Sequence, residues 1–193
     1  MFNKLVIASG NKGKLREIQT MLSPLSIEVV PQSDFNVPEA PEPHSTFIEN
    51  ALAKARHASL ATQLPALADD SGLCVEALNG EPGVQSAYFG GTPSNDVNNN
   101  AHLIKTLASH ENRAAYYYCC LVLVRSHDDH QPLIAKGIWH GSILKRARGN
   151  NGFGYDPLFL DSITGKSSAE LSPEIKNKVS HRGQALRKML HLI

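Results

Sequence analysis

The chain has 193 residues, of which 41% are hydrophobic and 19% charged, and its formal net charge at pH 7 is +1. This length is sufficient for one domain with a substantial core, and the composition is that of an ordinary globular protein. The near-zero net charge argues against a broad basic surface for non-specific nucleic-acid binding, so any anion site must be local.

The residue pattern gives no indication of export, membrane insertion or disulfide bonding. The first residues lack the order of a secretory signal, and no apolar run approaches the roughly 18 to 20 residues of a membrane span. Cys74, Cys119 and Cys120 form neither a metal-binding spacing nor a disulfide framework. We therefore expect a soluble cytoplasmic protein in which Cys119 and Cys120 are structural strand residues.

Apolar runs and turn residues alternate along the chain and predict an α/β protein with a mixed sheet. Thr46 and Glu49 form a capping box at a helix start, and Ser172 before proline marks another. The expected strands are residues 4–8, 26–30, 64–68, 73–78, 114–124 and 133–143, of which the last two form a hairpin. The expected helices are residues 14–22, 46–61 and 97–108, with a further helical region from residue 172 to the C-terminal end.

The first strand is followed by a turn of small residues and lysines, Ser9 to Lys14. Backbone N–H groups at a helix N-terminus, exposed by Gly10 and Gly13, attract phosphate, and the helix dipole adds to this attraction. Lys14 would add a charge and Asn11 a neutral donor. The spacing matches neither the P-loop nor the dinucleotide-binding glycine motif. Alone, the segment is either a phosphate site or an ordinary strand-to-helix turn.

Asp69 and Asp70 precede Ser71 and Gly72, between two apolar runs. Adjacent carboxylates repel each other unless positive charge is near, and a hard divalent cation such as Mg2+ is a usual partner. The same residue types are common in β-turns, so a turn between two strands is an equally open interpretation. Since neighbouring residues of an extended chain point to opposite faces, we expect one catalytic carboxylate rather than a matched dyad.

Acidic residues also lie on the proline-rich segment 37–43, which is stiff and irregular. Glu39 or Glu42 could supply a metal ligand there, or both could belong to a solvated acidic loop. Lys54 lies in the following helix, where a surface position is the default expectation.

Residues 152–157 (GFGYDP) combine two aromatic side chains with flanking glycines in an irregular segment. Such segments are poor core formers but good stacking platforms for bases. Asp156 could accept hydrogen bonds from a sugar or a base. Lys176, His181 and Arg182 place donors near the last helix, which suits a carbonyl-bearing base edge or a phosphate.

Together these segments closely resemble the inosine triphosphate pyrophosphatase family. Any single block is weak, but the ordered set is highly specific and spans nearly the whole chain. The blocks that carry the resemblance are residues 9–14 (SGNKGK), 46–56 (TFIENALAKAR), 68–73 (ADDSGL), 83–87 (GVQSA), 152–157 (GFGYDP), 169–171 (AEL) and 180–186 (SHRGQAL).

The resemblance implies an elongated mixed β-sheet flanked by helices, with two lobes around a deep substrate cleft, in one domain of residues 1–193 that forms a homodimer. It implies hydrolysis of ITP, dITP and XTP to the nucleoside monophosphate and pyrophosphate with Mg2+, which Mn2+ could replace. Asp70 would be the catalytic proton acceptor, and Glu42 and Asp70 the metal ligands, with Glu39 as the alternative to Glu42. The residues that the resemblance assigns to substrate binding are Ser9, Gly10, Asn11, Lys12, Gly13, Lys14, Lys54, Ser71, Phe153, Gly154, Tyr155, Asp156, Lys176, His181 and Arg182.

Two other functions remain open from the sequence. One is a related pyrophosphatase that acts on pyrimidine or modified nucleotides; the residues 180–183 (SHRG) and the aromatic segment favour purines instead. The other is a nucleotide- or RNA-binding module without turnover, against which the balanced charge and the lack of an RNA-recognition aromatic motif argue. We expect neither a nucleic-acid nor a membrane partner.

Overall fold

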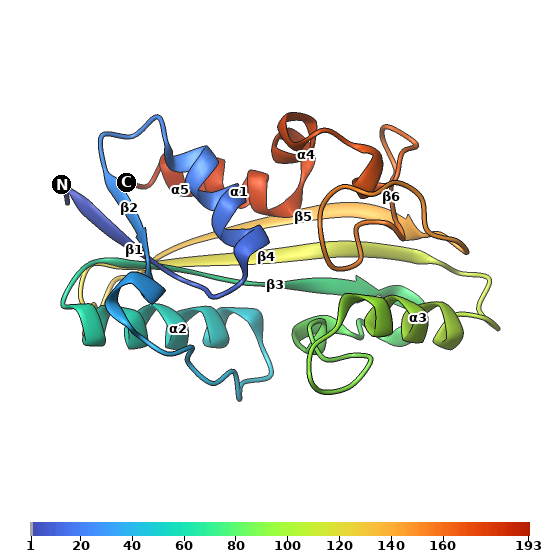
Figure 1. Ribbon diagram of the computed structural model, residues 1–193, viewed down its shortest axis with the longest axis horizontal. Coiled ribbons are helices and arrows are strands. Elements are labelled where there is room, and N and C mark those ends of the chain that lie inside the picture. Colours follow the sequence, from blue (N-terminus) through green and yellow to red (C-terminus); the bar gives the residue numbers. More distant parts are fainter. Residues whose placement is uncertain (1) are drawn as a thin grey trace. The chain divides into compact units, whose positions relative to one another are not determined.

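The computed structural model describes residues 2–193, which form an α/β fold (Figure 1). The strands are β1 (Lys4–Ala8), β2 (Glu28–Pro31), β3 (Ala66–Val75), β4 (Ala114–Val124), β5 (Leu133–Ile143) and β6 (Phe159–Asp161). The helices are α1 (Lys12–Leu22), α2 (Phe47–Thr62), α3 (Asp96–Thr106), α4 (Pro173–Val179) and α5 (His181–Leu190). Short 3-10 segments are η1 (Gln32–Phe35), η2 (Glu76–Leu78), η3 (Gly83–Gln85) and η4 (Ser168–Glu170).

The strands form a six-stranded mixed sheet in the order β2-β1-β3-β4-β5-β6. β1 pairs in parallel with both β2 and β3, whereas β5 and β6 are antiparallel. The expected α/β class with a mixed sheet is therefore confirmed. β6 escaped sequence-based prediction because it is only three residues long, too short for a period-2 pattern to stand out.

The segment around the two aspartates differs from the expectation of two strands joined by a turn. Residues 66–75 form one continuous strand, β3, and Asp69 to Gly72 lie inside it. The β-turn interpretation of these residues is therefore wrong. Turn propensity is a weak local preference, and here the place of β3 inside the sheet, between β1 and β4, and ion pairs to both carboxylates outweigh it.

The described chain divides into two compact units, each with its own hydrophobic core. The first unit comprises the described part of Met1–Asp70 together with Cys119–Gly137 and Arg182–Ile193. The second comprises Ser71–Tyr118 and Ile138–His181. β3, β4 and β5 therefore contribute residues to both units.

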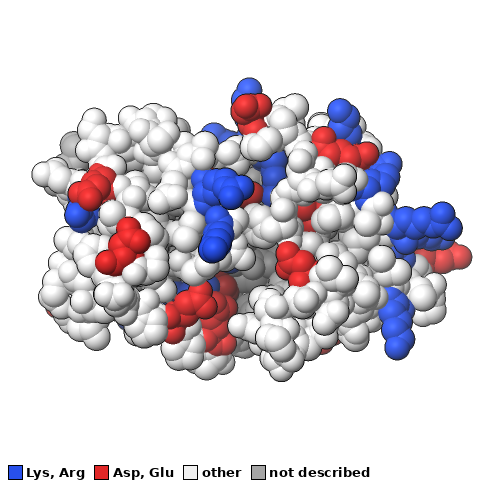
Figure 2. All heavy atoms as spheres, viewed as in Figure 1, with Lys and Arg blue, Asp and Glu red and all other residues white. Residues whose placement is uncertain are grey.

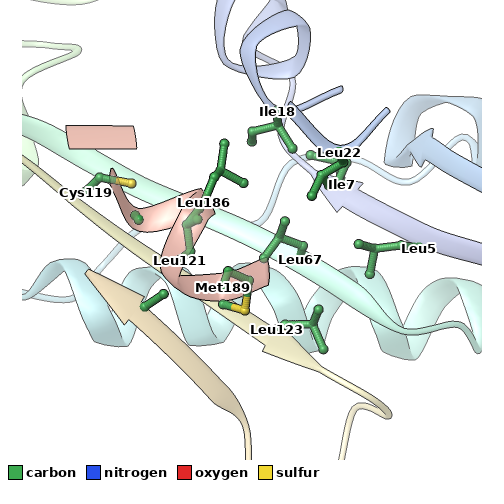
Figure 3. Packing of buried hydrophobic residues seen from close by; sticks show 12 residues of the cluster. Leu5, Ile7, Ile18, Leu22, Leu67, Cys119, Leu121, Leu123, Leu186 and Met189 are labelled. Atoms are coloured by element: carbon green, nitrogen blue, oxygen red, sulfur yellow. The ribbon is translucent and has the colours of Figure 1, made fainter. Parts of the chain in front are cut away.

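The core of the first unit forms where α1 and α5 pack on the strands (Figure 3). Ile18 and Leu22 of α1 and Leu186 and Met189 of α5 are fully buried there. In Figure 1, α2 lies on the opposite side of these strands from α1 and α5. The buried residues of α2 include three alanines, Ala51, Ala55 and Ala58, together with the polar Asn50, Lys54 and Ser59.

The core of the second unit is built on aromatic side chains. Tyr117 and Trp139 both pack on Phe159, with ring centroids 4.6 and 4.9 Å apart respectively. α3 adds the buried Leu103 to the same cluster, and Leu107, the C-cap residue directly after α3, joins it. The buried face of α3 carries Asn99 and Leu103, whereas Val97 and Ala101, two apolar residues on the face expected to be buried, are exposed.

Charged residues of both signs occupy the molecular face seen in Figure 2, and uncharged surface separates many of them. This mixed distribution agrees with the formal net charge of +1. Within the described residues, none of the helices combines the length and the apolar character required to cross a membrane.

Candidate active site

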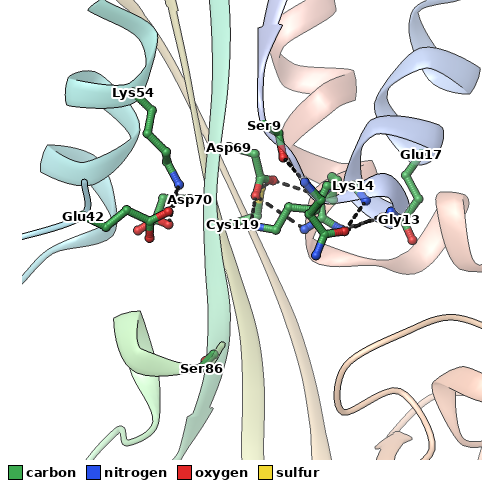
Figure 4. Close-up of polar contacts among 12 residues, drawn as sticks. Ser9, Gly13, Lys14, Glu17, Glu42, Lys54, Asp69, Asp70, Ser86 and Cys119 are labelled. Carbon is green, nitrogen blue, oxygen red and sulfur yellow. Dashed lines mark hydrogen bonds and ion pairs between the residues drawn. The ribbon is translucent and has the colours of Figure 1, made fainter. Parts of the chain in front are cut away.

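Asp69 and Asp70 point to opposite faces of β3, as expected for neighbours on an extended strand (Figure 4). Asp69 faces Lys14 of α1, and Asp70 faces Lys54 of α2. Both carboxylates are buried, with 1% and 3% of their surface exposed. The two acids therefore occupy separate ionic clusters, both in the first unit.

Asp70 shares the ammonium group of Lys54 with Glu42. The Lys54 Nζ lies 2.9 Å from Asp70 Oδ1 and 3.1 Å from Glu42 Oε1. Burial tends to lower the pKa of Lys54, but the charges of Asp70 and Glu42 outweigh burial and raise it. Burial raises the pKa of Asp70, against the opposing effect of Lys54. Lys54 is therefore a buried cation of the site rather than the surface residue that its helix position suggested.

The second oxygen of Asp70, Oδ2, is buried and has no hydrogen-bond partner among residues 2–193. An orphaned buried carboxylate oxygen is costly unless a ligand satisfies it. No group of three His, Cys, Asp or Glu side chains among the described residues could hold a metal ion. Mg2+, however, is commonly bound through one or two carboxylates together with substrate phosphates and water. Asp70 and Glu42 fit that mode of binding.

Asp69 forms the second ionic cluster. Its Oδ1 lies 2.7 Å from Lys14 Nζ, and its Oδ2 accepts hydrogen bonds from Arg182 Nε at 2.9 Å and the Cys119 thiol at 3.1 Å. Burial tends to raise the pKa of Asp69, but the charges of Arg182 and Lys14 outweigh it and hold this pKa well below its ordinary value. Arg182 also pairs with Glu17, which sequence reasoning missed. Asp69 is therefore a buried anion that anchors two cations.

The turn between β1 and α1 is capped by its own side chains. Asn11 is the N-cap of α1, and its Oδ1 accepts from the N–H groups of Gly13 and Lys14 at 2.9 and 3.0 Å. The Asn11 N–H in turn donates to Ser9 Oγ. The N–H groups of Gly13 and Lys14, two of the backbone donors expected to bind phosphate, are therefore used in the helix cap.

Glu39 and Glu42, both on the proline-rich segment, have different surroundings. The Glu39 carboxylate lies against Gly10 of the β1–α1 turn, where a Cβ atom would overlap it unless this exposed side chain moved. Glu42, by contrast, reaches Lys54 beside Asp70. Of the two acids left open by the sequence, Glu42 is the one in the Asp70 cluster.

The second unit carries its own polar cluster around Asp156. Asp156 Oδ2 accepts from the Phe153 N–H at 2.9 Å and pairs with Lys176 Nζ at 2.5 Å, while Oδ1 accepts from Ser168 Oγ at 2.8 Å. The Lys176 ammonium also lies over the Phe153 ring, 4.8 Å from its centroid. Asp156 thus shapes the aromatic loop, and its contact with a substrate stays a prediction.

Three further residues predicted to bind the substrate, His181, Tyr155 and Ser71, also lie in the second unit. His181 is buried, with its ring stacked on Tyr117 at a centroid distance of 4.6 Å and an interplanar angle of 10°. Tyr155 is also buried, and its hydroxyl donates to Ser86 O at 2.7 Å. Ser71 is half-buried, whereas the other residues of β3 are buried.

The predicted residues thus fall into two sets. The first unit contains residues 9–14, Glu42, Lys54, Asp70 and Arg182, and the second contains Ser71, residues 153–156, Lys176 and His181. The sequence did not single out Glu17, Asp96, Asn100 or Ser168. Glu17 lies one turn after Lys14, and Asp96 and Asn100 are four residues apart on α3, so helical spacing was the available signal.

Comparison with known proteins gives matches over almost the whole chain. A family model described as the Ham1 family matches residues 5–192. A "dITP/XTP pyrophosphatase" of Aromatoleum aromaticum is 57% identical over 190 residues, covering 98% of this chain and 96% of that protein. One of Chromobacterium violaceum is 58% identical over 190 residues, with the same coverage of 98% and 96%.

A solved structure, a HAM1 protein from Coxiella burnetii, is similar to this chain with a TM-score of 0.92 and 44% sequence identity. The similarity covers 100% of this chain and 98% of that one. The sequence and structural matches confirm the family relationship that the ordered motifs indicated. The chain belongs to the Ham1 family.

Proposed function

We propose that this protein hydrolyses the non-standard purine nucleotides ITP, dITP and XTP to the nucleoside monophosphate and pyrophosphate. The observation that carries the proposal is Asp70, a buried carboxylate with one oxygen on Lys54 and the other unpartnered among the described residues. Relatives named dITP/XTP pyrophosphatase, more than half identical over almost the full length, supply the substrate class.

Asp70 serves as the proton acceptor for the attacking water. Lys54 holds Oδ1, so Oδ2 is the oxygen directed to the water. Asp70 is buried, and its Oδ2 has no partner among the described residues, so this oxygen is available to a water in the site. Release of pyrophosphate requires that the water attack the α-phosphorus.

The triphosphate needs positive charge to accept an incoming nucleophile. Lys14, at the start of α1, leaves its ion pair with Asp69 and binds a phosphate oxygen instead. Residues 9–13 supply further hydrogen-bond donors from the same turn. Glu42 and Asp70 hold Mg2+, or Mn2+ in its place. A metal ion held there would supply positive charge that offsets the charge of the phosphates.

The nucleoside end is bound by the polar cluster of the second unit, and Arg182 is a further predicted donor. Phe153 stacks on the base, and Ser71, Asp156 and Lys176 contact the substrate. The 6-oxo group accepts from His181 or Arg182, for which Arg182 must exchange one of its carboxylate partners. Adenine carries a 6-amino group that leaves such donors unpaired, at a cost of about 1–3 kcal/mol each.

A product assay with labelled water tests this function. The protein is incubated with Mg2+ and ITP, XTP, ATP, GTP or dTTP in 18O-water. We expect pyrophosphate and a labelled monophosphate from ITP and XTP, since attack at the α-phosphorus puts the new oxygen there. Chelation of Mg2+ is the matched control and should stop turnover.

Four results would contradict the proposal. Release of orthophosphate, or label in the pyrophosphate, would exclude attack at the α-phosphorus. Equal rates on ATP would exclude recognition of the 6-oxo group. Faster hydrolysis of dTTP would support the alternative, a related pyrophosphatase for pyrimidine or modified nucleotides.

We also propose that the protein works as a homodimer in the cytoplasm, as the family resemblance implies. A solution mass near twice the 21.0 kDa of the chain, measured by sedimentation, would support the dimer. A mass equal to that of one chain would exclude it.

A further inference from the structure

The loop that carries Phe153 has a backbone that only glycine readily adopts at two positions. Gly152 and Gly154 have φ angles of +81° and +61°, in the left-handed region. A Cβ on Gly152 would also overlap the Asp156 carboxylate, whereas Gly154 has open space around it. Gly154 is therefore a position where backbone conformation alone selects glycine, and such a loop needs outside contacts to hold one conformation.

Helix α3 supplies those contacts through two side chains. The Gly154 N–H donates to Asp96 Oδ2 at 2.7 Å, and Asn100 Nδ2 donates to the Gly154 carbonyl at 2.8 Å. Asn100 Nδ2 also donates to the Asp96 carbonyl in its own helix. Asp96 and Asn100 thus hold both polar groups of Gly154 from one face of α3.

The hydrogen bonds from α3 act together with others that hold the backbone around Phe153. The Phe153 N–H donates to Asp156 Oδ2, and the Phe153 carbonyl accepts from the Asp156 N–H at 3.2 Å. With Gly154 held on both sides by Asp96 and Asn100, the chain around Phe153 is anchored before and after the ring. On this anchored backbone, the Phe153 ring lies under the Lys176 ammonium, 4.8 Å from it.

Helix capping does not account for these contacts. The N-cap of α3 is Asn95, whose side chain accepts from the Asn98 N–H at 3.0 Å. Asn100 is in the second turn, beyond the cap, and bridges to a residue 54 positions later in the chain. An aspartate in the first helical turn is favourable for the helix dipole, but this does not explain its bond to Gly154.

We propose that Asp96 and Asn100 are positioning residues that hold the Phe153 ring in the orientation in which it stacks on the nucleoside. This inference rests on the proposed function, since it takes Phe153 as the base platform. It deepens that function by adding α3 to the parts of the chain that determine nucleoside affinity. The triphosphate end of the substrate should not depend on these two residues.

The test compares variants of the full chain by two measurements, hydrogen exchange of residues 152–156 and calorimetric affinity for inosine monophosphate and for pyrophosphate. The variants are Asn100→Ala, Asn100→Asp, Asp96→Ala and Asp96→Asn. Asn98→Ala is the matched control, because Asn98 is exposed on the same helix. Asp96→Asn keeps an acceptor for the Gly154 N–H and should restore wild-type behaviour, as a merely electrostatic role would not.

For Asn100→Ala and Asp96→Ala we expect faster exchange in the loop and inosine monophosphate affinity lower by about three- to tenfold, with unchanged pyrophosphate affinity. Asn100→Asp should lose more affinity for inosine monophosphate, because it directs a carboxylate at the Gly154 carbonyl and the two groups repel each other. With ITP as substrate, KM should rise while kcat changes little.

Unchanged loop exchange in Asn100→Ala, or an equal effect of Asn98→Ala, would overturn the inference. Faster exchange with unchanged inosine monophosphate affinity would also overturn it, because the contacts would then be structural alone. Failure of the proposed function is a separate result: the wild-type protein itself would release no pyrophosphate from ITP.

Discussion

At the scale of single residues, Asp69 and Asp70 show how neighbours in sequence acquire opposite chemistry. Asp69 is held by Lys14, Arg182 and the Cys119 thiol, so its charged form is stabilised despite complete burial. Asp70 forms an ion pair with Lys54, its other oxygen has no partner among the described residues, and burial raises its pKa. The anion with more partners is suited to structure, and the one with fewer is suited to taking up a proton.

Substitution of each aspartate by asparagine should therefore have a different effect. Asp70→Asn should lower activity, and Asp69→Asn should lower stability. Asp70→Asn cannot accept a proton, so turnover of ITP should fall by roughly 10²- to 10⁴-fold. Its fold should be retained, because ionised Asp70 is already disfavoured by burial. Asp69→Asn leaves Lys14 and Arg182 less compensated and should lower the free energy of unfolding by about 3–5 kcal/mol.

Urea unfolding and initial rates on ITP, measured for both variants, decide between these outcomes. Asp34→Asn is the control, since Asp34 is exposed in the first unit. An active Asp70→Asn together with a folded but inactive Asp69→Asn would reverse the assignment of the catalytic carboxylate.

At the scale of elements, β6 and the turn after it are held by one carboxylate. Asp161 ends β6, accepts from Trp139 Nε1 at 2.8 Å through Oδ1, and accepts from the Thr164 N–H at 2.9 Å through Oδ2. Burial tends to raise the pKa of Asp161, but these hydrogen bonds outweigh it and lower the pKa below the ordinary value of 3.8. The turn is thus stabilised by the ionised form of Asp161.

The stability contributed by Asp161 should therefore depend on pH in acid. Because its pKa is lower in the folded than in the unfolded chain, the contribution is present above a pH of about 4 and is lost as the pH falls through the folded pKa. Wild type and Asp161→Asn should differ at neutral pH and converge in acid. Ser162→Ala in the same turn, which removes no titrating group, should show a difference that does not depend on pH.

Trp139, the single tryptophan of the chain, reports this unfolding by its fluorescence in urea at each pH. A constant difference between wild type and Asp161→Asn from neutral pH to pH 3 would show that the charge of Asp161 does not stabilise the turn.

At the scale of the whole molecule, the chain forms two compact units that share three strands. β3, β4 and β5 each begin in one unit and end in the other, so the unfolding of either unit interrupts strands of both. Each unit nevertheless has its own core, one aliphatic and one built on aromatic rings. Shared strands favour a single cooperative transition, in keeping with the single domain expected from the sequence.

A cavity in the core of the first unit should therefore lower the urea midpoint of unfolding that the tryptophan in the second unit reports. Leu121→Ala removes a fully buried side chain of the first core and should cost about 2–5 kcal/mol. We expect Trp139 fluorescence and far-ultraviolet circular dichroism to shift to the same lower urea midpoint. Leu60→Ala, at an exposed position of α2, should shift neither. A circular dichroism midpoint that falls while the Trp139 midpoint stays would establish two independently folding domains.

Much of the local structure was readable from residue patterns. β4 and β5 coincide with the expected strands, and α2 starts at its capping box as expected. These elements carry strong local signals of periodicity and capping, which act over a few residues. The prediction for β3 was wrong at Asp69 to Gly72, where local turn propensity suggested a break in the strand. The ion pairs that outweigh this propensity come from distant parts of the chain.

The sequence by itself determined the α/β class, most of the helices and strands and, through its ordered motifs, the family; the role of Asp70 stays a prediction. Only the tertiary structure decided which cation meets which carboxylate. Asp69 and Arg182 are 113 residues apart, and Asn100 and Gly154 are 54 apart. Such pairs leave no periodic trace along the chain, since they depend on how strands and helices pack rather than on the residues beside them.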